Sequence, residues 1–236
     1  MKQLTDALTD MGVSYDDEML RKFRKYMELI LEWNEKVNLT AITDQEEFIK
    51  KHYVDSVAIC AFSQMKEAKT VIDVGTGAGF PGVPLAILHP EKEFLLMDSL
   101  NKRIKIIDGI SQEIGLKNVS FRHGRAEELA QNKEYREQFD LCVSRAVANL
   151  AVLSEYCLPF VKVGGWFAPY KTGAIDAELN ESRRAISLLG GRLEGNEQLN
   201  IKGYDLDHRI LLIRKVGKTL AKYPRKAGTP AKEPLK

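Results

Sequence analysis

The chain of 236 residues contains 44% hydrophobic and 29% charged residues, which excludes wholesale disorder and fits one large α/β domain or a core domain with a small appendage. Its formal net charge is +2, and its three cysteines, Cys60, Cys142 and Cys157, form no CxxC pair. No apolar stretch approaches the roughly 18 residues that span a bilayer. We therefore expect a soluble cytoplasmic protein without a disulfide scaffold, a metal site or a membrane partner.

Residues 1–66 are predicted to form an N-terminal helical segment. The apolar face of one helix is indicated by four residues at helical spacing, Leu20, Phe23, Met27 and Leu31. Farther along, Asp44-Gln45-Glu46-Glu47 has the form of a capping box and predicts a helix that continues to about Met65. We expect these helices to build core and to carry no chemistry.

From Thr70 onward, short apolar runs alternate with helical patterns. The predicted strands are 70–74, 94–97, 119–122, 139–144 and 166–170, and the predicted helices are 83–89, 101–115, 147–162 and 175–189. This alternation predicts βαβ units and a parallel sheet. The runs 192–199 and 209–216 have only Asn200–His208 between them, so they should pair as an antiparallel hairpin. Residues 67–216 are therefore predicted to form a methyltransferase-type Rossmann fold, a mostly parallel seven-stranded sheet that ends in this hairpin.

Residues 217–236 form a predicted basic C-terminal tail. From Arg214 to Lys236 there are eight basic residues and one acidic residue, a net charge of +7, which leaves −5 for the rest of the chain. This imbalance indicates a polyanionic partner, nucleic acid before acidic lipid, and a solvated solubility tail explains it equally well. The two prolines and one glycine in 223–230 predict an extended chain in which Tyr223 offers a stacking face among cations.

Residues 71–82, with the sequence VIDVGTGAGFPG, predict a buried strand, a glycine-rich turn and a helix start. Its first three glycines, Gly75, Gly77 and Gly79, allow a ligand to approach the backbone closely. In open α/β sheets ligands bind here, at the carboxyl ends of the strands. Counted from Gly77, the run also satisfies G-x-G-x-x-G, so an NAD-linked oxidoreductase remains an alternative.

Two features of this turn favour S-adenosylmethionine over a dinucleotide. Asp73 lies in the strand end just before the glycines, where a carboxylate suits a sulfonium and an ammonium group. Pro81 follows the turn and removes one N–H from a helix start that would otherwise bind pyrophosphate. We therefore expect S-adenosylmethionine as the cofactor.

The following strand ends carry further candidates. Asp98 comes 23 residues after Gly75, close to the ~20-residue spacing at which an acid meets ribose hydroxyls, and it suits a helix N-cap as well. Ala126 and Glu127 follow the third predicted strand, where an adenine edge would lie, although Glu127 also suits a helix dipole. Arg145 ends the fourth strand beside the predicted methyl donor, with a core ion pair as the alternative.

With these residues in view, the chain resembles the RsmG (GidB) family of small-subunit ribosomal RNA methyltransferases over nearly its whole length. The resemblance is carried by Trp33-Asn34, Val37-Asn38-Leu39-Thr40, Asp55-Ser56, Asp73 to Gly82, Asp98-Ser99-Leu100 with Lys102-Arg103, Gly124-Arg125-Ala126-Glu127, Ser144-Arg145-Ala146-Val147, Gly164-Gly165 and Tyr223-Pro224-Arg225. It implies methylation of a guanine N7 in 16S rRNA. It also implies donor contacts at Gly75, Phe80, Ala126, Glu127 and Arg145.

The chemistry agrees with what the sequence lacks. The chain has no Asn/Asp-Pro-Pro-aromatic motif for an exocyclic amine, and no cysteine in a Gly-Pro loop for attack on a ring carbon. Guanine N7 has a lone pair and no proton, so we expect direct in-line displacement driven by positioning rather than by a general base. Arg145 is the first candidate for the guanine N7/O6 edge or the donor carboxylate, ahead of Arg122, Arg125, Lys102 and Lys171.

We expect Arg145 to be the catalytic residue and to act by positioning. The cofactor-binding candidates are Asp73, Gly75, Gly77, Gly79, Phe80, Asp98, Ala126, Glu127 and Arg145. The RNA-binding candidates are Lys222, Tyr223, Arg225, Lys226, Arg122 and Arg125, whereas His52 and His123 are expected to be structural. The expected partner of a monomeric enzyme is 16S rRNA or the small ribosomal subunit, and a non-catalytic rRNA-binding or ribosome-assembly factor is a further alternative.

Overall fold

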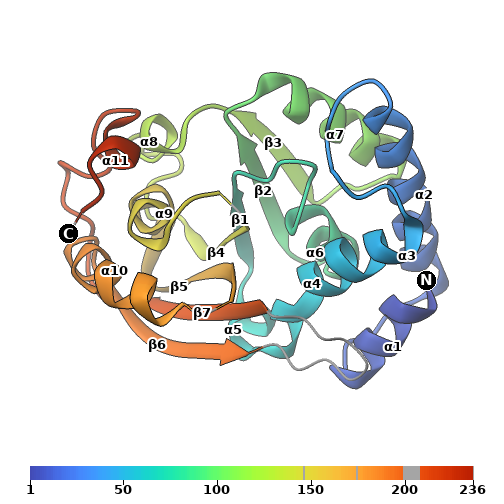
Figure 1. Ribbon diagram of the computed structural model, residues 1–236, viewed down its shortest axis with the longest axis horizontal. Helices are drawn as coiled ribbons and strands as arrows, with labels where there is room; N and C mark the ends of the chain where they lie inside the picture. The colour runs from blue at the N-terminus through green and yellow to red at the C-terminus, as the bar shows by residue number, and fades with distance from the viewer. Residues whose placement is uncertain (146, 174, 199–207, 236) are drawn as a thin grey trace.

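The computed structural model describes residues 1–145, 147–173, 175–198 and 208–235 and centres on a seven-stranded sheet of order β3-β2-β1-β4-β5-β7-β6 (Figure 1). The strands are β1 (Thr70–Val74), β2 (Glu93–Asp98), β3 (Val119–His123), β4 (Phe139–Arg145), β5 (Val161–Thr172), β6 (Gly191–Gln198) and β7 (His208–Lys215). Strands β1 to β5 are parallel, whereas β7 runs antiparallel to β5 and β6. The predicted fold is confirmed. The predicted hairpin connection up to residue 207, together with Ala146, Ala174, Leu199 and Lys236, lies outside the described residues.

Helices cover both faces of this sheet (Figure 1). The helices α6 (Gly82–Leu88) and α7 (Asn101–Glu113) share one hydrophobic cluster with the N-terminal helices, whereas α8 (Ala126–Leu129), α9 (Leu150–Cys157) and α10 (Asp176–Leu188) belong to the other face. None of the helices in the described part of the chain is long and apolar enough to cross a membrane.

The fourth crossover helix is shorter than the predicted 147–162. It begins after Asn149, whose side chain accepts a hydrogen bond from the backbone N–H of Val152 at 3.1 Å and so caps the helix. It ends at Cys157 in the 3-10 turn η3 (Leu158–Phe160), because Pro159 has no N–H with which to continue an α-helix. Residues 147–149 are consequently a loop at the carboxyl end of β4, where they border the site described below.

The N-terminal residues form the predicted helices with one difference. The elements are α1 (Lys2–Asp10), α2 (Asp17–Asn34), α3 (Gln45–Phe48), the π-helix η1 (Ile49–Val54), α4 (Asp55–Val57), the 3-10 helix η2 (Ala58–Ala61) and α5 (Ser63–Glu67). The predicted cap is present, since Asp44 accepts a hydrogen bond from the N–H of Glu47 at 2.9 Å. The helix that it opens passes through a π turn and ends before the extended residue Phe62, short of Met65. π turns are frequent at functional sites, and this one carries His52 to the site.

The C-terminal segment is folded against the α8 and α9 side of the sheet and contains the short helix α11 (Thr229–Lys232) (Figure 1). Tyr223 is 7% exposed and belongs to the hydrophobic cluster on that face. The prediction of an extended tail with an exposed Tyr223 ring is therefore wrong. Burial of a large aromatic ring stabilises the folded segment, and the local proline pattern carries no signal of that packing. The division of the chain at residues 66 and 216 stays a prediction.

Candidate functional site

The glycine turn after β1 requires glycine at its first position. Gly75 has a φ of +74°, and a Cβ there would lie 2.6 Å from Cγ2 of Val147. The N–H of Gly77 donates to Oδ2 of Asp98 at 3.0 Å, so the turn is held against the end of β2. This close approach between the turn and the β4–α9 loop is why a side chain at position 75 would close the crevice between them.

Asp73 forms hydrogen bonds within the same turn. It is fully buried, and its Oδ2 accepts hydrogen bonds from the hydroxyl of Thr76 at 2.6 Å and from the N–H of Gly82 at 2.9 Å. Burial raises its pKa to about 6. The Asp73 carboxylate thus occupies the N–H of Gly82 at the start of α6, where a dinucleotide would bind its pyrophosphate. Pro81, just before it, has no N–H to offer. This arrangement counts against the NAD-linked alternative.

A first cavity, here called the donor cavity, brings together Gly75, Asp98, Ala126 and Glu127 of the predicted cofactor residues. It lies at the carboxyl ends of β1 and β2 and is also lined by Val74, Met97, Ser99, Gly124, Arg125, Val147 and Tyr156. Asp98 and Glu127 are 6% and 5% exposed. Their carboxylates accept hydrogen bonds only, which suits the ribose hydroxyls and the adenine amine of an adenosyl group. The cavity therefore fits S-adenosylmethionine.

Phe80 and Gly79 lie on the far side of the glycine turn, against the N-terminal helices. Gly79 faces the hydroxyl of Tyr26, which donates to the carbonyl of Ala78 at 2.7 Å. The Phe80 ring is stacked on His52, with centroids 4.4 Å apart and an interplanar angle of 4°. These two predicted cofactor residues are not among those that line the donor cavity, and their observed contacts support the turn from behind.

Arg145 is surrounded by partners from the N-terminal segment. Its Nη1 donates to Oδ2 of Asp55 at 2.6 Å and to the carbonyl of Lys51 at 3.0 Å, and its Nη2 lies 3.1 Å from Nδ1 of His52. Its guanidinium lies 5.4 Å from the centroid of the Phe80 ring. Arg145 is therefore held in a fixed position at the carboxyl end of β4.

Asp55 also accepts a hydrogen bond from Nδ1 of His208 at the start of β7. Burial alone raises the pKa of Asp55, but the hydrogen bond with His208 and the charge of Arg145 outweigh it and bring the pKa below its usual value. Burial and the neighbouring Arg145 lower the pKa of His52 to about 3. At neutral pH, Asp55 is thus an anion and His52 a neutral ring that pairs with Thr40 at 2.7 Å through Nε2.

A second cavity, here called the acceptor cavity, lies at the carboxyl ends of β4 and β5. Its lining residues are Asp55, Arg145, Ala148, Leu153, Tyr170, Lys171, Thr172, Glu178 and His208. Lys171 is 12% exposed, and its Nζ donates to Glu178 at 2.6 Å and to the carbonyl of Ala148 at 2.9 Å. Because Val147 lines the donor cavity and Ala148 lines this one, the β4–α9 loop separates the two cavities.

Sequence reasoning missed three residues of the acceptor cavity. Asp55 entered only as part of a family motif, and Glu178 and His208 were not selected at all. His208 meets Asp55 across 153 residues, and no local pattern connects them. Lys171, a weaker candidate, is the cation nearest to Glu178 in this cavity.

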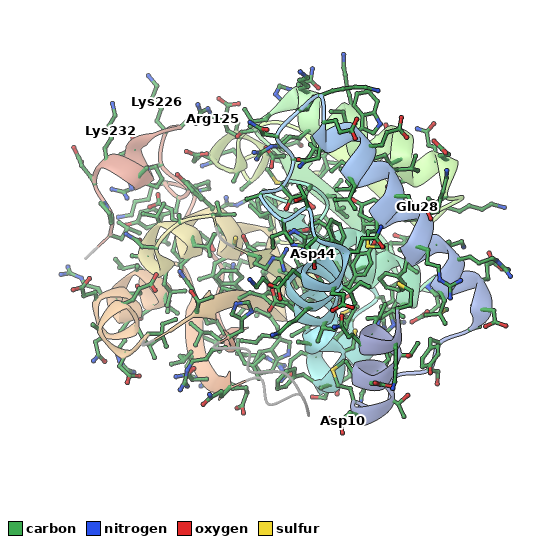
Figure 2. The ribbon with its side chains drawn as sticks, turned by 45° about the vertical axis from the view of Figure 1, so that its right-hand side comes forward. Asp10, Glu28, Asp44, Arg125, Lys226 and Lys232 are labelled. Carbon is green, nitrogen blue, oxygen red and sulfur yellow. The ribbon has the colours of Figure 1, made fainter. Side chains whose placement is uncertain are left out.

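The predicted RNA-binding residues fall into two groups. Arg122, Arg125, Lys222 and Lys226 are exposed, and Figure 2 shows Lys226 and Lys232 pointing outward near Arg125. Tyr223 and Arg225 instead hold the C-terminal segment in place, since the Tyr223 ring is buried and Arg225 pairs with buried Glu155 at 2.7 Å. Among the residues described, no group of three or more acidic, His or Cys side chains is placed to hold a metal ion.

The fold and the donor cavity together define a Rossmann-type, S-adenosylmethionine-dependent methyltransferase. A solved S-adenosylmethionine-dependent O-methyltransferase from Thermotoga maritima has the same fold, with a TM-score of 0.53 and 15% identity over 81% of this chain and 72% of that chain. Residues 19–205 match the model of the GidB family, rRNA small subunit methyltransferase G.

The ribosomal RNA small subunit methyltransferase G of Clostridium tetani is 50% identical over 233 residues, which are 99% of this chain and 98% of that protein. The protein of the same name from Clostridium perfringens (strain 13 / Type A) is 49% identical over 100% of this chain and 98% of its own length. The chain belongs to this family, and the predicted resemblance is confirmed.

Proposed function

We propose that this protein transfers a methyl group from S-adenosylmethionine to N7 of a guanine in 16S rRNA. The observation that carries the proposal is the pair of neighbouring cavities at the carboxyl edge of the sheet. One offers carboxylates to an adenosyl group, and the other offers a lysine–carboxylate pair to a base, with only the β4–α9 loop between them. Family membership supports the same reaction.

The donor cavity binds and orients the cofactor. Asp98 is assigned to the ribose hydroxyls and Glu127 to the adenine side, while Gly75 leaves room for the ligand against the β4–α9 loop. When bound, S-adenosylmethionine supplies an electrophilic methyl group. Asp73 acts from inside the glycine turn by fixing Thr76 and Gly82, so its effect on the cofactor is through the turn.

The acceptor cavity recognises guanine through complementary charges. A lysine ammonium has three N–H donors, of which two of Lys171 are used by Glu178 and Ala148, so the third is assigned to guanine O6. Glu178 Oε1 already accepts hydrogen bonds from Lys171 and from the N–H of Leu150, so its other oxygen, Oε2, is assigned to the N1–H of the base. Adenine presents a donor where guanine has O6, and therefore pairs poorly with Lys171.

The reaction itself needs no general base from this chain. Guanine N7 attacks through a lone pair in the ring plane and loses no proton, so the contribution of the chain is positioning and a preorganised field. Arg145 is assigned a positioning role, because an arginine that donated to N7 would occupy the attacking lone pair. The anions Asp55 and Glu178 stabilise the positive charge that the base acquires.

RNA phosphates are assigned to the exposed cations Arg125, Lys226 and Lys232, which lie near one another in Figure 2, together with exposed Arg122 on β3 and exposed Lys222. The substrate is 16S rRNA or the assembled small subunit in the cytoplasm, and the enzyme acts as a monomer. A base in folded rRNA has to be unstacked to enter the acceptor cavity, so recognition is expected to involve a loop base.

The test incubates the protein with labelled S-adenosylmethionine and either 16S rRNA or 30S particles. Borohydride reduction and aniline cleavage then map N7-methylated guanines. We expect a single cleavage site in at least one substrate. Absence of cleavage in both, with donor binding confirmed, contradicts the assignment to N7. Labelled RNA without N7 cleavage identifies another acceptor atom, and unlabelled RNA with intact RNA binding favours the non-catalytic assembly factor.

A further inference from the structure

The C-terminal segment after β7 is fixed to the body of the protein by a buried ion pair. Glu155 on α9 is fully buried, and its carboxylate accepts hydrogen bonds from Nε, Nη2 and the backbone N–H of Arg225 at 2.7–3.2 Å. Such a bidentate arginine–carboxylate contact fixes both distance and orientation. Arg225 Nη2 also donates to the carbonyl of Glu233 at 2.8 Å, so this one side chain holds both ends of the stretch that contains Gly228.

The approach to Arg225 is fixed as well. Arg136 donates to the carbonyls of Thr219 at 2.8 Å and Tyr223 at 2.9 Å, and Gln131 donates to the carbonyl of Pro224 at 2.9 Å. These side chains satisfy the backbone of a segment that has little regular structure of its own. Up to residue 235, the last that the structure describes here, the charged segment is therefore folded onto the surface of the domain.

This segment reaches the donor cavity through one hydrogen bond. The backbone N–H of Gly228 donates to Oε1 of Glu127 at 2.9 Å. Glu127 is one of the residues that line the donor cavity, and it lies on the four-residue helix α8. Gly228 has a φ of +84°, a conformation that turns its N–H toward the carboxylate at little cost for glycine. The orientation of Glu127 is thus set by the C-terminal segment.

We propose that Arg225 is a positioning residue of the cofactor site, which fixes the C-terminal segment so that Gly228 holds the Glu127 carboxylate in the wall of the donor cavity. The inference rests on the proposed function in one respect, namely that the donor cavity binds an adenosyl ligand. It gives the basic C-terminal segment a role in donor binding in addition to any contact with RNA.

The test measures the Kd of S-adenosylhomocysteine by titration calorimetry with the full-length chain. Arg225→Ala is expected to raise the Kd about tenfold, the effect of weakening one hydrogen bond to a charged group. Arg225→Lys keeps the charge near Glu155 but loses the bidentate contact, so an intermediate Kd is expected and the proposal remains testable if the alanine variant does not fold. Lys218→Ala, an exposed lysine of the same segment, is the control and should leave the Kd unchanged.

A double-mutant cycle separates positioning from general stability. If Arg225 acts through Glu127, then Arg225→Ala should change the Kd by less than about twofold in a Glu127→Ala background, which has no side-chain acceptor for the N–H of Gly228. Additive losses, or a lowered melting temperature with an unchanged Kd, overturn the positioning role. A wild-type protein that fails to bind S-adenosylhomocysteine contradicts the proposed function instead, so the two failures are distinguishable.

Discussion

Arg145 Nη1 lies 2.6 Å from Asp55 Oδ2, although 90 residues separate the two along the chain. The Asp55 side chain is fully buried and that of Arg145 is 15% exposed. The ion pair joins the end of β4 to the N-terminal helical segment, and both residues line the acceptor cavity. The N-terminal helical segment therefore forms part of the wall of this cavity, because Asp55 at the start of α4 holds Arg145 in place.

Breaking this pair should be costly for folding. Asp55→Asn removes the charge with little change of shape and leaves Arg145 without its buried anion. We expect the free energy of unfolding, measured by urea denaturation, to fall by about 3 kcal/mol. Glu47→Gln removes an exposed partner of Lys51 in the same helical stretch and should cost less than about 1 kcal/mol. Similar small losses for both variants would mean that the Arg145 pair contributes no more than a surface pair.

Asp73 should make the folded protein less stable as the pH rises, whereas an acid paired with a cation makes it more stable. Burial raises its pKa to about 6. Protonated Asp73 therefore favours the folded state below the unfolded-state pKa of about 4, and this contribution is lost as the pH rises through 6. Between pH 4 and pH 7 we expect the unfolding free energy of Asp73→Asn, relative to wild type, to increase by roughly 2 kcal/mol.

Asp140→Asn is the matched control for this pH series. Burial raises the pKa of Asp140, but hydrogen bonds with Lys162 and the Thr70 region bring it down to about 2. Its stabilising contribution is present above the unfolded-state pKa and is lost only as the pH falls toward 2. The difference between Asp140→Asn and wild type should thus stay nearly constant from about pH 5 to 7. A flat series for Asp73→Asn as well would show that Asp73 has an ordinary pKa.

The fold was predictable because its signals are local. The strands β1, β2 and β4 contain short apolar runs, and β1 matches its predicted bounds of residues 70–74. The strand β5 is longer than the predicted 166–170, because it begins at Val161 directly after the 3-10 turn η3. The antiparallel end of the sheet followed from the absence of a helical pattern in the sequence between the two strand-like runs. The shortened α9 was not predicted, because the helical pattern extends past Asn149 and Pro159 while the cap and the missing N–H decide its ends.

The site was predictable only in part. The donor cavity gathers residues that lie at or shortly after the carboxyl end of a strand, so the order of the strands brings Gly75, Asp98 and Glu127 together. The acceptor cavity and the C-terminal segment depend on pairs such as Asp55 with His208 and Glu155 with Arg225. Such pairs join residues far apart in sequence, and either partner alone reads as an ordinary surface charge.

Lys171 tests the assignment of the acceptor cavity. Lys171→Met removes the proposed donor to guanine O6, and we expect kcat/KM for RNA to fall 10–100-fold, which corresponds to about 1–3 kcal/mol. The Kd of S-adenosylhomocysteine should be unchanged, because Lys171 lines the other cavity. Lys162→Met, at the start of the same strand and 49% exposed, is the control. A Lys171 variant that loses donor affinity to the same extent as activity would contradict the separation of the two cavities.

The exposed cations near α11 should determine how RNA binding responds to salt. Each phosphate contact to single-stranded RNA contributes about 0.7 to the slope of log Kobs against log salt, so Lys226→Ala with Lys232→Ala should lower that slope by about 1.4.

Lys69 and Lys117 are exposed at the amino ends of β1 and β3, on the sheet edge opposite the cavities, and their double alanine variant is the control for net charge. Its slope should match that of wild type, because these lysines face away from the bound RNA. Filter-binding titrations from 50 to 300 mM KCl, about the range over which phosphate contacts dominate, measure both slopes. Equal slopes for the two double variants would exclude the C-terminal segment from the RNA interface and leave it only the structural role of fixing Glu127.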